Sequence, residues 1–341
     1  MTDQKPASAE TSRKNIWRIF PGIFVSLVAL GVLFTLVDWP VFVAALTKAD
    51  YRYLLLALPI YIVSYMVRSR GWHILLMEEP PYKLVYLTEQ AGYLMNNVLP
   101  FRLGELGRAV LLGRHGLGFW RVFSTIIVER AFDMILAAGL LLGSLALVAD
   151  VPGAQQVGII ISLIMLAGMY TLYLLARNQD RVLAWFDRLG KRWPRLIEMG
   201  RDRLTSFLTG LTPLTDFRRF IRVILWIASS WGMAILAHYL ILLAFIPQAT
   251  LLWMVFAISV AMIGIALPSS PGFIGVYEAA YVGALSVFGV SYESALAVAL
   301  VDHVFYIGLT GIVGVYALVR EGLSLSQLAR RVQQERSSEI S

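Results

Sequence analysis

Residues 99–107 read LPFRLGELG and residues 267–275 read LPSSPGFIG, so the two stretches share the pattern L-P-x-x-x-G-x-x-G. Proline removes a backbone hydrogen-bond donor and glycine permits a tight turn, so each stretch predicts a break in a helix. We expect the breaks to hinge at Pro100, Gly104, Gly107, Pro268, Pro271, Gly272 and Gly275. Within a bilayer, such breaks persist only beside a cavity or buried in protein, so they indicate a candidate cavity.

The sequence around the two breaks has the composition of a membrane protein. Of its 341 residues, 58% are hydrophobic and 15% are charged, and the mean hydropathy is +0.70. A soluble domain carries about 25% charged residues, so a soluble fold is excluded. Six apolar stretches are long enough to cross the hydrocarbon as helices, at about 17–37, 53–76, 121–149, 155–176, 222–246 and 294–319.

Several classes of site are excluded by the residue types that the sequence lacks. The chain has no cysteine, which excludes a disulfide scaffold and a thiolate metal site. Its four histidines stand far apart, and the glycine-rich stretch 104–118 lacks the ending of a nucleotide-binding loop. We therefore predict no catalytic residue, no metal and no cofactor. The net charge of +7 is assigned to cytoplasmic loops and lipid headgroups, with no nucleic acid as partner.

Basic residues predict the orientation of the chain. Eleven lie in the segment 177–222, and further clusters precede the first span and follow the last. The positive-inside rule places all three clusters in the cytoplasm. This requires the broken stretches, 84–113 and 251–289, to enter and leave on one side, as re-entrant hairpins or as pairs of tilted helices. The prediction is an all-α, multi-pass protein with six spanning helices, two broken or re-entrant helix pairs and both termini in the cytoplasm.

The two broken stretches also predict an internal repeat. Each is preceded by one apolar helix and followed by a long one, which gives halves at about 53–149 and 222–319, joined by a basic cytoplasmic connector at 177–221. The first break opens to the cytoplasm and the second to the outside, so the halves have inverted topology. Inverted repeats with broken helices are typical of transporters, whose substrates bind near the midplane. The helix after each break directs its positive end toward that point, which favours an anion.

Charged residues within the apolar stretches are candidates for the substrate site, because a charge at the bilayer centre is costly. The candidate binding residues are Arg102, Glu105, Arg108, Glu129, Arg130, Glu278 and His303, with Asp133 assigned to a structural ion pair. In one interpretation the arginines only neutralise the acids. In the other, at least one arginine is left to bind phosphate or another anion. Glu278, Asp302 and His303 could also form a proton relay.

Three segments resemble a known family. NNVLPFRLGELGRA (96–109), VERAFD (128–133) and LPSSPGFIGVYEAA (267–280) are similar to the lysylphosphatidylglycerol synthase transmembrane-region family, also described as a flippase-like domain. The resemblance implies a bacterial or archaeal inner membrane. In two-domain relatives this region moves an aminoacylated phospholipid, which a separate cytosolic domain makes. We expect that synthase domain to be absent here. The expected domains are a disordered tail at 1–15, a flippase-like domain at 16–322 and a cytoplasmic tail at 323–341.

Together these patterns predict a flippase or transporter that moves a lipid, or a lipid-linked anionic amphiphile, between leaflets. Two alternatives stay open at this point. One is a membrane-embedded enzyme acting on lipid headgroups, with Glu105 and Glu278 as acid and base. The other is a non-transporting accessory subunit of an envelope-lipid pathway. The expected partners are membrane lipids and a lipid-synthesis enzyme, and the sequence is compatible with an oligomer.

Overall fold

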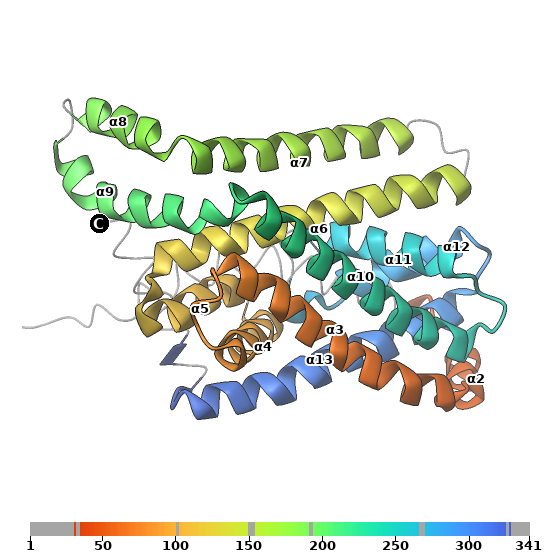
Figure 1. The fold of residues 1–341 in the computed structure, drawn as a ribbon. Helices are drawn as coiled ribbons and strands as arrows, with labels where there is room; N and C mark the ends of the chain where they lie inside the picture. Colours follow the sequence, from red (N-terminus) through yellow and green to blue (C-terminus); the bar gives the residue numbers. More distant parts are fainter. Residues whose placement is uncertain are drawn as a thin grey trace, which may run out of the picture.

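The computed structural model describes residue 31 and residues 35–99, 102–148, 154–190, 194–265, 270–324 and 327–328. Every regular element in these ranges is a helix, which confirms the all-α prediction (Figure 1). Several predictions fall outside them: Pro100, Pro268, the tail at 1–15, nearly all of the first predicted span at 17–37, and most of the tail at 323–341.

The helices follow one another closely along the chain. They are α2 (Trp39–Lys48), α3 (Tyr51–Leu75), α4 (Tyr82–Val98), α5 (Leu103–Leu112), η1 (Gly113–Leu117), α6 (Phe119–Val148), α7 (Ala154–Arg177), α8 (Gln179–Gly190), α9 (Pro194–Gly210), η2 (Thr212–Leu214), α10 (Phe217–Phe245), α11 (Leu251–Gly264), η3 (Pro271–Phe273), α12 (Val276–Ser286) and α13 (Tyr292–Arg320). Of these, α10 and α13 are long and apolar enough to cross a membrane by length and composition. The six-span count stays a prediction.

Helices α3 and α10 form a closely packed antiparallel pair. The amide of Asp50, at the start of α3, donates to the carbonyl of Ala244, at the end of α10, over 2.9 Å. Near the opposite ends, Gly71 lies so close to α10 that a Cβ there would be 3.1 Å from a side-chain carbon of Ile227. Because the start of α3 meets the end of α10, and the end of α3 meets the first half of α10, the two helices run in opposite directions with their faces in close contact.

The first broken stretch folds into an antiparallel hairpin of α4 and α5. A Cβ on Gly104 would lie 1.9 Å from the carbonyl oxygen of Gly92, so the two backbones touch. Gly107 also lies close to α4, where a Cβ on it would be 2.3 Å from the sulfur of Met95. The Asn96 side chain accepts a hydrogen bond from the Gly104 amide over 2.8 Å and so satisfies a free donor at the start of α5. The chain therefore reverses direction at the first break.

The second broken stretch forms a matching hairpin of α11 and α12. In the described part of its turn, residues 270–275, three residues have positive φ: Gly272 (67°), Phe273 (59°) and Gly275 (89°). Two of the three are glycines, which tolerate this conformation. Figure 1 shows α4 and α5 at one end of the long helices, and α11 and α12 at the other. The two hairpins thus enter the bundle from opposite ends.

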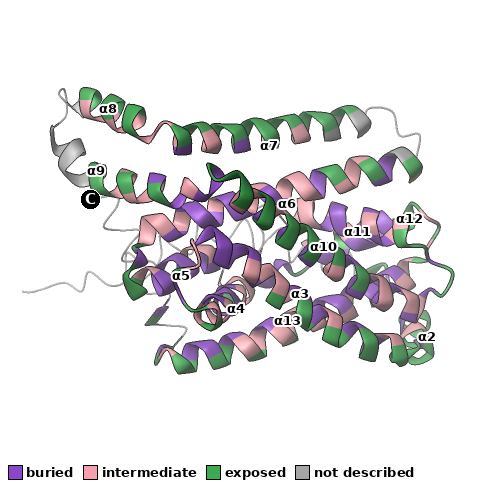
Figure 2. Cartoon of the chain, viewed as in Figure 1, coloured by how far each residue is buried: buried purple, intermediate pink, exposed green. Residues whose placement is uncertain are grey.

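The remaining long helices pack against the hairpins and against one another. Helix α6 packs against α5, α7, α9 and α11, and α13 packs against α4 and α12. Helix α7 lies on the outside, where it exposes apolar side chains such as Ile160, Leu163 and Ile164 (Figures 1 and 2). The predicted basic connector contains α8 and α9, and α8 exposes Trp185. The exposed apolar row on α7 is the kind of surface expected for contact with lipid.

The loop between α3 and α4 is fastened by ion pairs. Glu78 contacts Arg222 and Arg70, each over 2.9 Å, and Glu79 pairs with Arg121. The hydrogen bond from Arg222 lowers the pKa of Glu78, and the hydrogen bond from Arg121 lowers the pKa of Glu79. These bonds join the loop to the starts of α6 and α10, so they hold one end of the bundle together.

Candidate functional site

A cavity of about 180 Å³ lies between α3, α10 and the two hairpins. Helix α3 contributes Tyr61, Ser64, Tyr65 and Arg68, at the helical spacing i, i+3, i+4 and i+7. Helix α10 contributes Trp231, Ala234, Ile235 and His238 at the same spacing, together with Ser230. Most of the wall is aromatic or apolar, and the charged groups gather on two sides. Such a cavity has room for several waters or a small polar group, because one water needs about 10–15 Å³.

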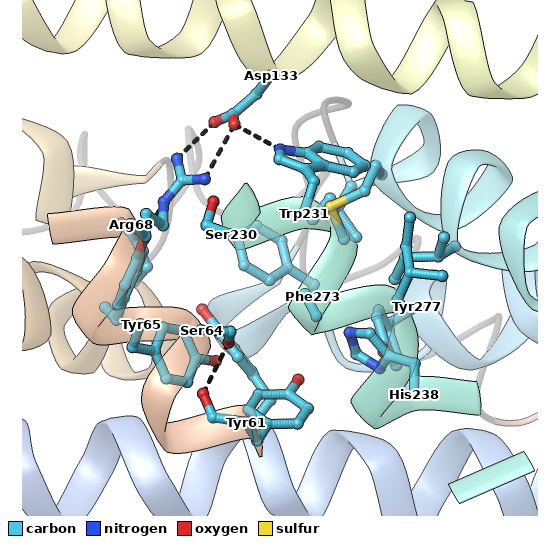
Figure 3. A pocket seen from close by; sticks show the side chains of 18 of the residues that line it. Tyr61, Ser64, Tyr65, Arg68, Asp133, Ser230, Trp231, His238, Phe273 and Tyr277 are labelled. Carbon is cyan, nitrogen blue, oxygen red and sulfur yellow. Dashed lines mark hydrogen bonds and ion pairs between the residues drawn. The ribbon is translucent and has the colours of Figure 1, made fainter. Parts of the chain in front are cut away.

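Arg68 and Asp133 form the centre of the charged side (Figure 3). Arg68 donates to both carboxylate oxygens of Asp133, over 3.0 and 2.7 Å, and its Nε donates to the Tyr93 hydroxyl over 2.8 Å. The indole N–H of Trp231 donates to the same carboxylate over 3.0 Å. This bidentate geometry fixes both side chains, since each can adopt few other orientations while keeping its bonds.

Behind this wall, Glu129 contacts three arginines. It pairs with Arg68, accepts from Arg108 over 2.6 Å and accepts from Arg130 over 2.8 Å. Arg108 also lies over the Trp72 ring, 3.9 Å from its centre. Glu129 and Arg108 are almost completely buried. With Glu89, which accepts from Ser69 and Tyr93, the network holds the cations Arg68, Arg108 and Arg130 against the anions Glu89, Glu129 and Asp133.

Arg102 stands apart from this balanced network, at the tip of the first hairpin. It has a left-handed backbone, with φ of 52°, and its Nη2 donates to the carbonyl of Ile265 in the second hairpin over 2.7 Å. Its guanidinium lies 5.3 Å from the centre of the Phe273 ring. Glu105 is its nearest carboxylate, at 3.8 Å. The tips of the two hairpins therefore meet beside the cavity, and the cation at their contact has a longer carboxylate contact than Arg68, Arg108 or Arg130.

The other side of the cavity carries histidines and tyrosines in place of arginines. Asp302 accepts from Tyr277 and lies 2.6 Å from Nδ1 of His238. His303 lies 2.5 Å from Glu278 through Nδ1 and 2.7 Å from the Gly272 carbonyl through Nε2. Glu278 also accepts from the Gly275 amide over 2.6 Å. This side links α13 to the turn of the second hairpin.

The structure brings the predicted residues into one region, at two depths. Arg102, Glu105, Arg130, His303 and Asp133 line the cavity. Arg108, Glu129 and Glu278 are bonded behind the lining residues, in the contacts described above. Asp133 belongs to an ion-pair network and also faces the cavity. The hinge glycines Gly104 and Gly107 pack between α4 and α5, and Pro271, Gly272 and Gly275 form the second turn.

Several residues of this region were not predicted. Arg68, Glu89, Tyr93, Trp231 and His238 all take part in its polar contacts. Arg68 is a charged residue within an apolar stretch, so the rule that identified the other charged residues could also have identified Arg68. Across the residues that the structure describes, no three His, Asp or Glu side chains are placed to hold one metal ion.

Comparison with known proteins identifies the family. The family model described as the lysylphosphatidylglycerol synthase TM region matches residues 19–314, so the chain belongs to this family of membrane proteins. A UPF0104 membrane protein of Methanothermobacter thermautotrophicus is 26% identical over 246 residues, which cover 67% of this chain and 72% of that protein. A protein of Haloferax volcanii named glycosyltransferase AglD is 26% identical over 296 residues, which cover 74% of this chain. The match spans 46% of the Haloferax protein. No solved structure matches.

Proposed function

We propose that this protein is a flippase or transporter that moves a lipid, or a lipid-linked anionic amphiphile, between leaflets of the inner membrane. The observation that carries the proposal is the position of Arg102. It lies at the contact of two opposed hairpin tips, faces the cavity and has its nearest carboxylate at 3.8 Å. An arginine with donors to spare is suited to a phosphate, because its planar fork binds two oxygens at once.

Arg130 is the second cation offered to a headgroup. Its side chain lines the cavity, and its Nε donates no hydrogen bond and lies 3.7 Å from Glu105. The aromatic wall, including Tyr65, Tyr93 and Tyr306, excludes bulk water and supplies hydroxyls to a polar group. The cavity is far too small for two acyl chains. The headgroup would therefore pass through the protein while the chains stay in the bilayer.

The proposed architecture is an inverted-repeat transporter with six spans and both termini in the cytoplasm, and two features of the fold support the repeat. The antiparallel pair α3 and α10 presents matching positions to the cavity, and the two hairpins enter from opposite ends. In such folds one repeat rocks against the other around a fixed midplane site. Here the moving contact would be the one between the hairpin tips. Separation of Arg102 from Ile265 on one side would open the cavity to one leaflet.

A translocation assay tests this proposal. The purified chain is reconstituted in phosphatidylcholine vesicles with a short-chain fluorescent phosphatidylglycerol, and back-extraction by albumin measures how much probe reaches the outer leaflet. We expect the wild type to exceed protein-free vesicles, and Arg102→Ala to fall at least tenfold below it. Arg320→Ala, at the exposed end of α13, is the matched control. Equal rates for Arg102→Ala and the control would refute the site.

The same vesicles separate the alternatives. Mass spectrometry of the recovered lipid detects a membrane-embedded enzyme, because a consumed or modified headgroup changes the mass of the probe. Because the Haloferax relative is named a glycosyltransferase, this measurement is also made with a sugar donor added. An accessory subunit would neither move nor modify the probe, and would co-purify stably with a lipid-synthesis enzyme.

A further inference from the structure

The two sides of the cavity have related sequences. Residues 128–133 read VERAFD in α6, and residues 301–306 read VDHVFY in α13, so an acid–base pair occupies the same place in both. The helix partners agree as well. In the first half, Arg68 of α3 pairs with Glu129, and in the second half, His238 of α10 pairs with Asp302. Where the first half carries Arg68 and Arg130, the second carries His238 and His303. An imidazole ring, unlike a guanidinium group, exists in proteins in both a neutral and a charged form.

The two contacts of His303 require two protons, which is one more than a neutral imidazole ring carries. Its Nε2 faces the carbonyl of Gly272 at 2.7 Å, and a carbonyl can only accept, so Nε2 carries a hydrogen. Its Nδ1 faces Glu278 at 2.5 Å. A bare nitrogen lone pair against a carboxylate would repel it, so a second proton lies between them. The pair is either an imidazolium with a carboxylate or an imidazole with a carboxylic acid.

This proton holds the second hairpin to α13. Glu278 lies in the first turn of α12 and also accepts from the Gly275 amide, while Gly272 lies in the turn itself. Without the proton, the Nδ1 contact is lost and Glu278 becomes an uncompensated buried anion. Arg102 contacts this turn through Ile265 and Phe273. His303 attaches the turn to α13 by two contacts, and loss of the proton removes one of them.

The groups around His303 indicate that its charge changes by gain or loss of a proton. The groups that face it are the Tyr277 ring at 4.7 Å, the Tyr306 ring at 6.1 Å and Glu278. The neighbouring carboxylate, Asp302, is engaged by Tyr277 and His238. Arg68, Arg102 and Arg130 are the cations that line the same cavity from the opposite side. His303 and Glu278 are buried, and His303 lines the cavity, so a proton reaches the pair through the cavity.

We propose that His303 and Glu278 form a proton-binding site that latches the second hairpin to α13, and that release of this proton couples lipid movement to a proton gradient. The site itself stands on the contacts above, while the coupling rests on the proposed function. In this proposal the proton leaves toward one side of the membrane before the tips separate and is replaced from the other side afterwards, so one proton crosses the protein in each cycle. One proton per lipid is the stoichiometry of a single site.

Nitrogen NMR tests the proton site without any transport. The full chain carries only His73, His115, His238 and His303, so labelled histidine gives few signals in a nanodisc sample. The His303→Gln variant assigns the signal. We expect the His303 ring nitrogens to change between pH 5 and pH 9, and Glu278→Gln to lower the proton affinity at least tenfold. The exposed His115 is the internal control. A His303 signal that is constant with pH, or unchanged by Glu278→Gln, overturns the site.

A pH gradient tests the coupling. In the same vesicles, with valinomycin and potassium holding the membrane potential at zero, one pH unit can sustain about a tenfold ratio of probe between leaflets for one proton per lipid. We expect the wild type to build this ratio, and His303→Arg, with a fixed charge, to leave the leaflets equal. Equal leaflets in the wild type overturn the coupling alone. If the wild type moves no probe even without a gradient, the proposed function and the coupling fail together, and the NMR titration still decides the proton site.

Discussion

Replacing Glu129 by glutamine is expected to be among the most destabilising single changes in the chain. Glu129 is 1% exposed and contacts Arg68, Arg108 and Arg130, so glutamine keeps the shape but leaves three cations facing two anions, Glu89 and Asp133. Removing one partner of a buried ion pair costs about 3–5 kcal/mol, because the remaining charge stays buried without compensation. The matched control is Glu79→Gln in the loop. Its half-exposed carboxylate has the single partner Arg121, so its loss is under about 1 kcal/mol.

The free energy of unfolding in mixed SDS micelles measures both variants. The double variant Arg108→Gln, Glu129→Gln tests the reason for the loss, because it returns the network to equal numbers of cations and anions. We expect it to recover about 1–3 kcal/mol relative to the sum of the two single losses, as contacting residues do. If Glu129→Gln costs no more than Glu79→Gln, or if the two buried changes add without recovery, the network is not the balanced unit described above.

Two further predictions concern packing and pH. Gly104→Ala places a Cβ 1.9 Å from the Gly92 carbonyl and should lower the unfolding free energy by about 1–3 kcal/mol or more. The control Gly139→Ala, whose Cβ would have nothing within 4 Å, should not lower it. Equal effects of the two changes would contradict the hairpin contact. Arg222 lowers the pKa of Glu78 below the ordinary value of about 4.3, so its stabilisation is present above that pH and is lost as pH falls through the lower folded-state pKa. Thermal unfolding at pH 6 and pH 3.5 should therefore show a smaller loss on acidification for Glu78→Gln than for the wild type, and parallel losses would refute the ion pair.

The sequence allowed the helical class and the location of the cavity to be predicted. Charges are rare in its apolar stretches, so Arg102, Glu105, Arg130 and His303 stood out, and the two Pro-Gly patterns indicated the breaks beside which they lie. These are local signals, because each depends on residues within a few positions of one another. The same signals predicted the helix pairs that the structure places as hairpins.

The partners of those charges could not be predicted in the same way. Arg68 binds Asp133, which is 65 positions away, and His238 binds Asp302, which is 64 positions away. These pairs form because α3 packs against α6 and α10 packs against α13, and no short pattern encodes that packing. The contact of Arg102 with Ile265, 163 positions away, also needed the tertiary fold.

The central claim is that the two hairpin tips must separate for a headgroup to pass, and a reversible cross-link tests it most directly. The chain has no cysteine, and a Cβ on Gly272 would lie 3.8 Å from the Cα of Asn97 in the first hairpin, which is within the reach of a disulfide. The variant Asn97→Cys, Gly272→Cys is measured by albumin back-extraction, oxidised and then reduced, beside Gly272→Cys alone. The account predicts that oxidation stops probe movement in the double variant and that reduction restores it to the rate of the single variant. Movement at the same rate in both redox states would contradict it.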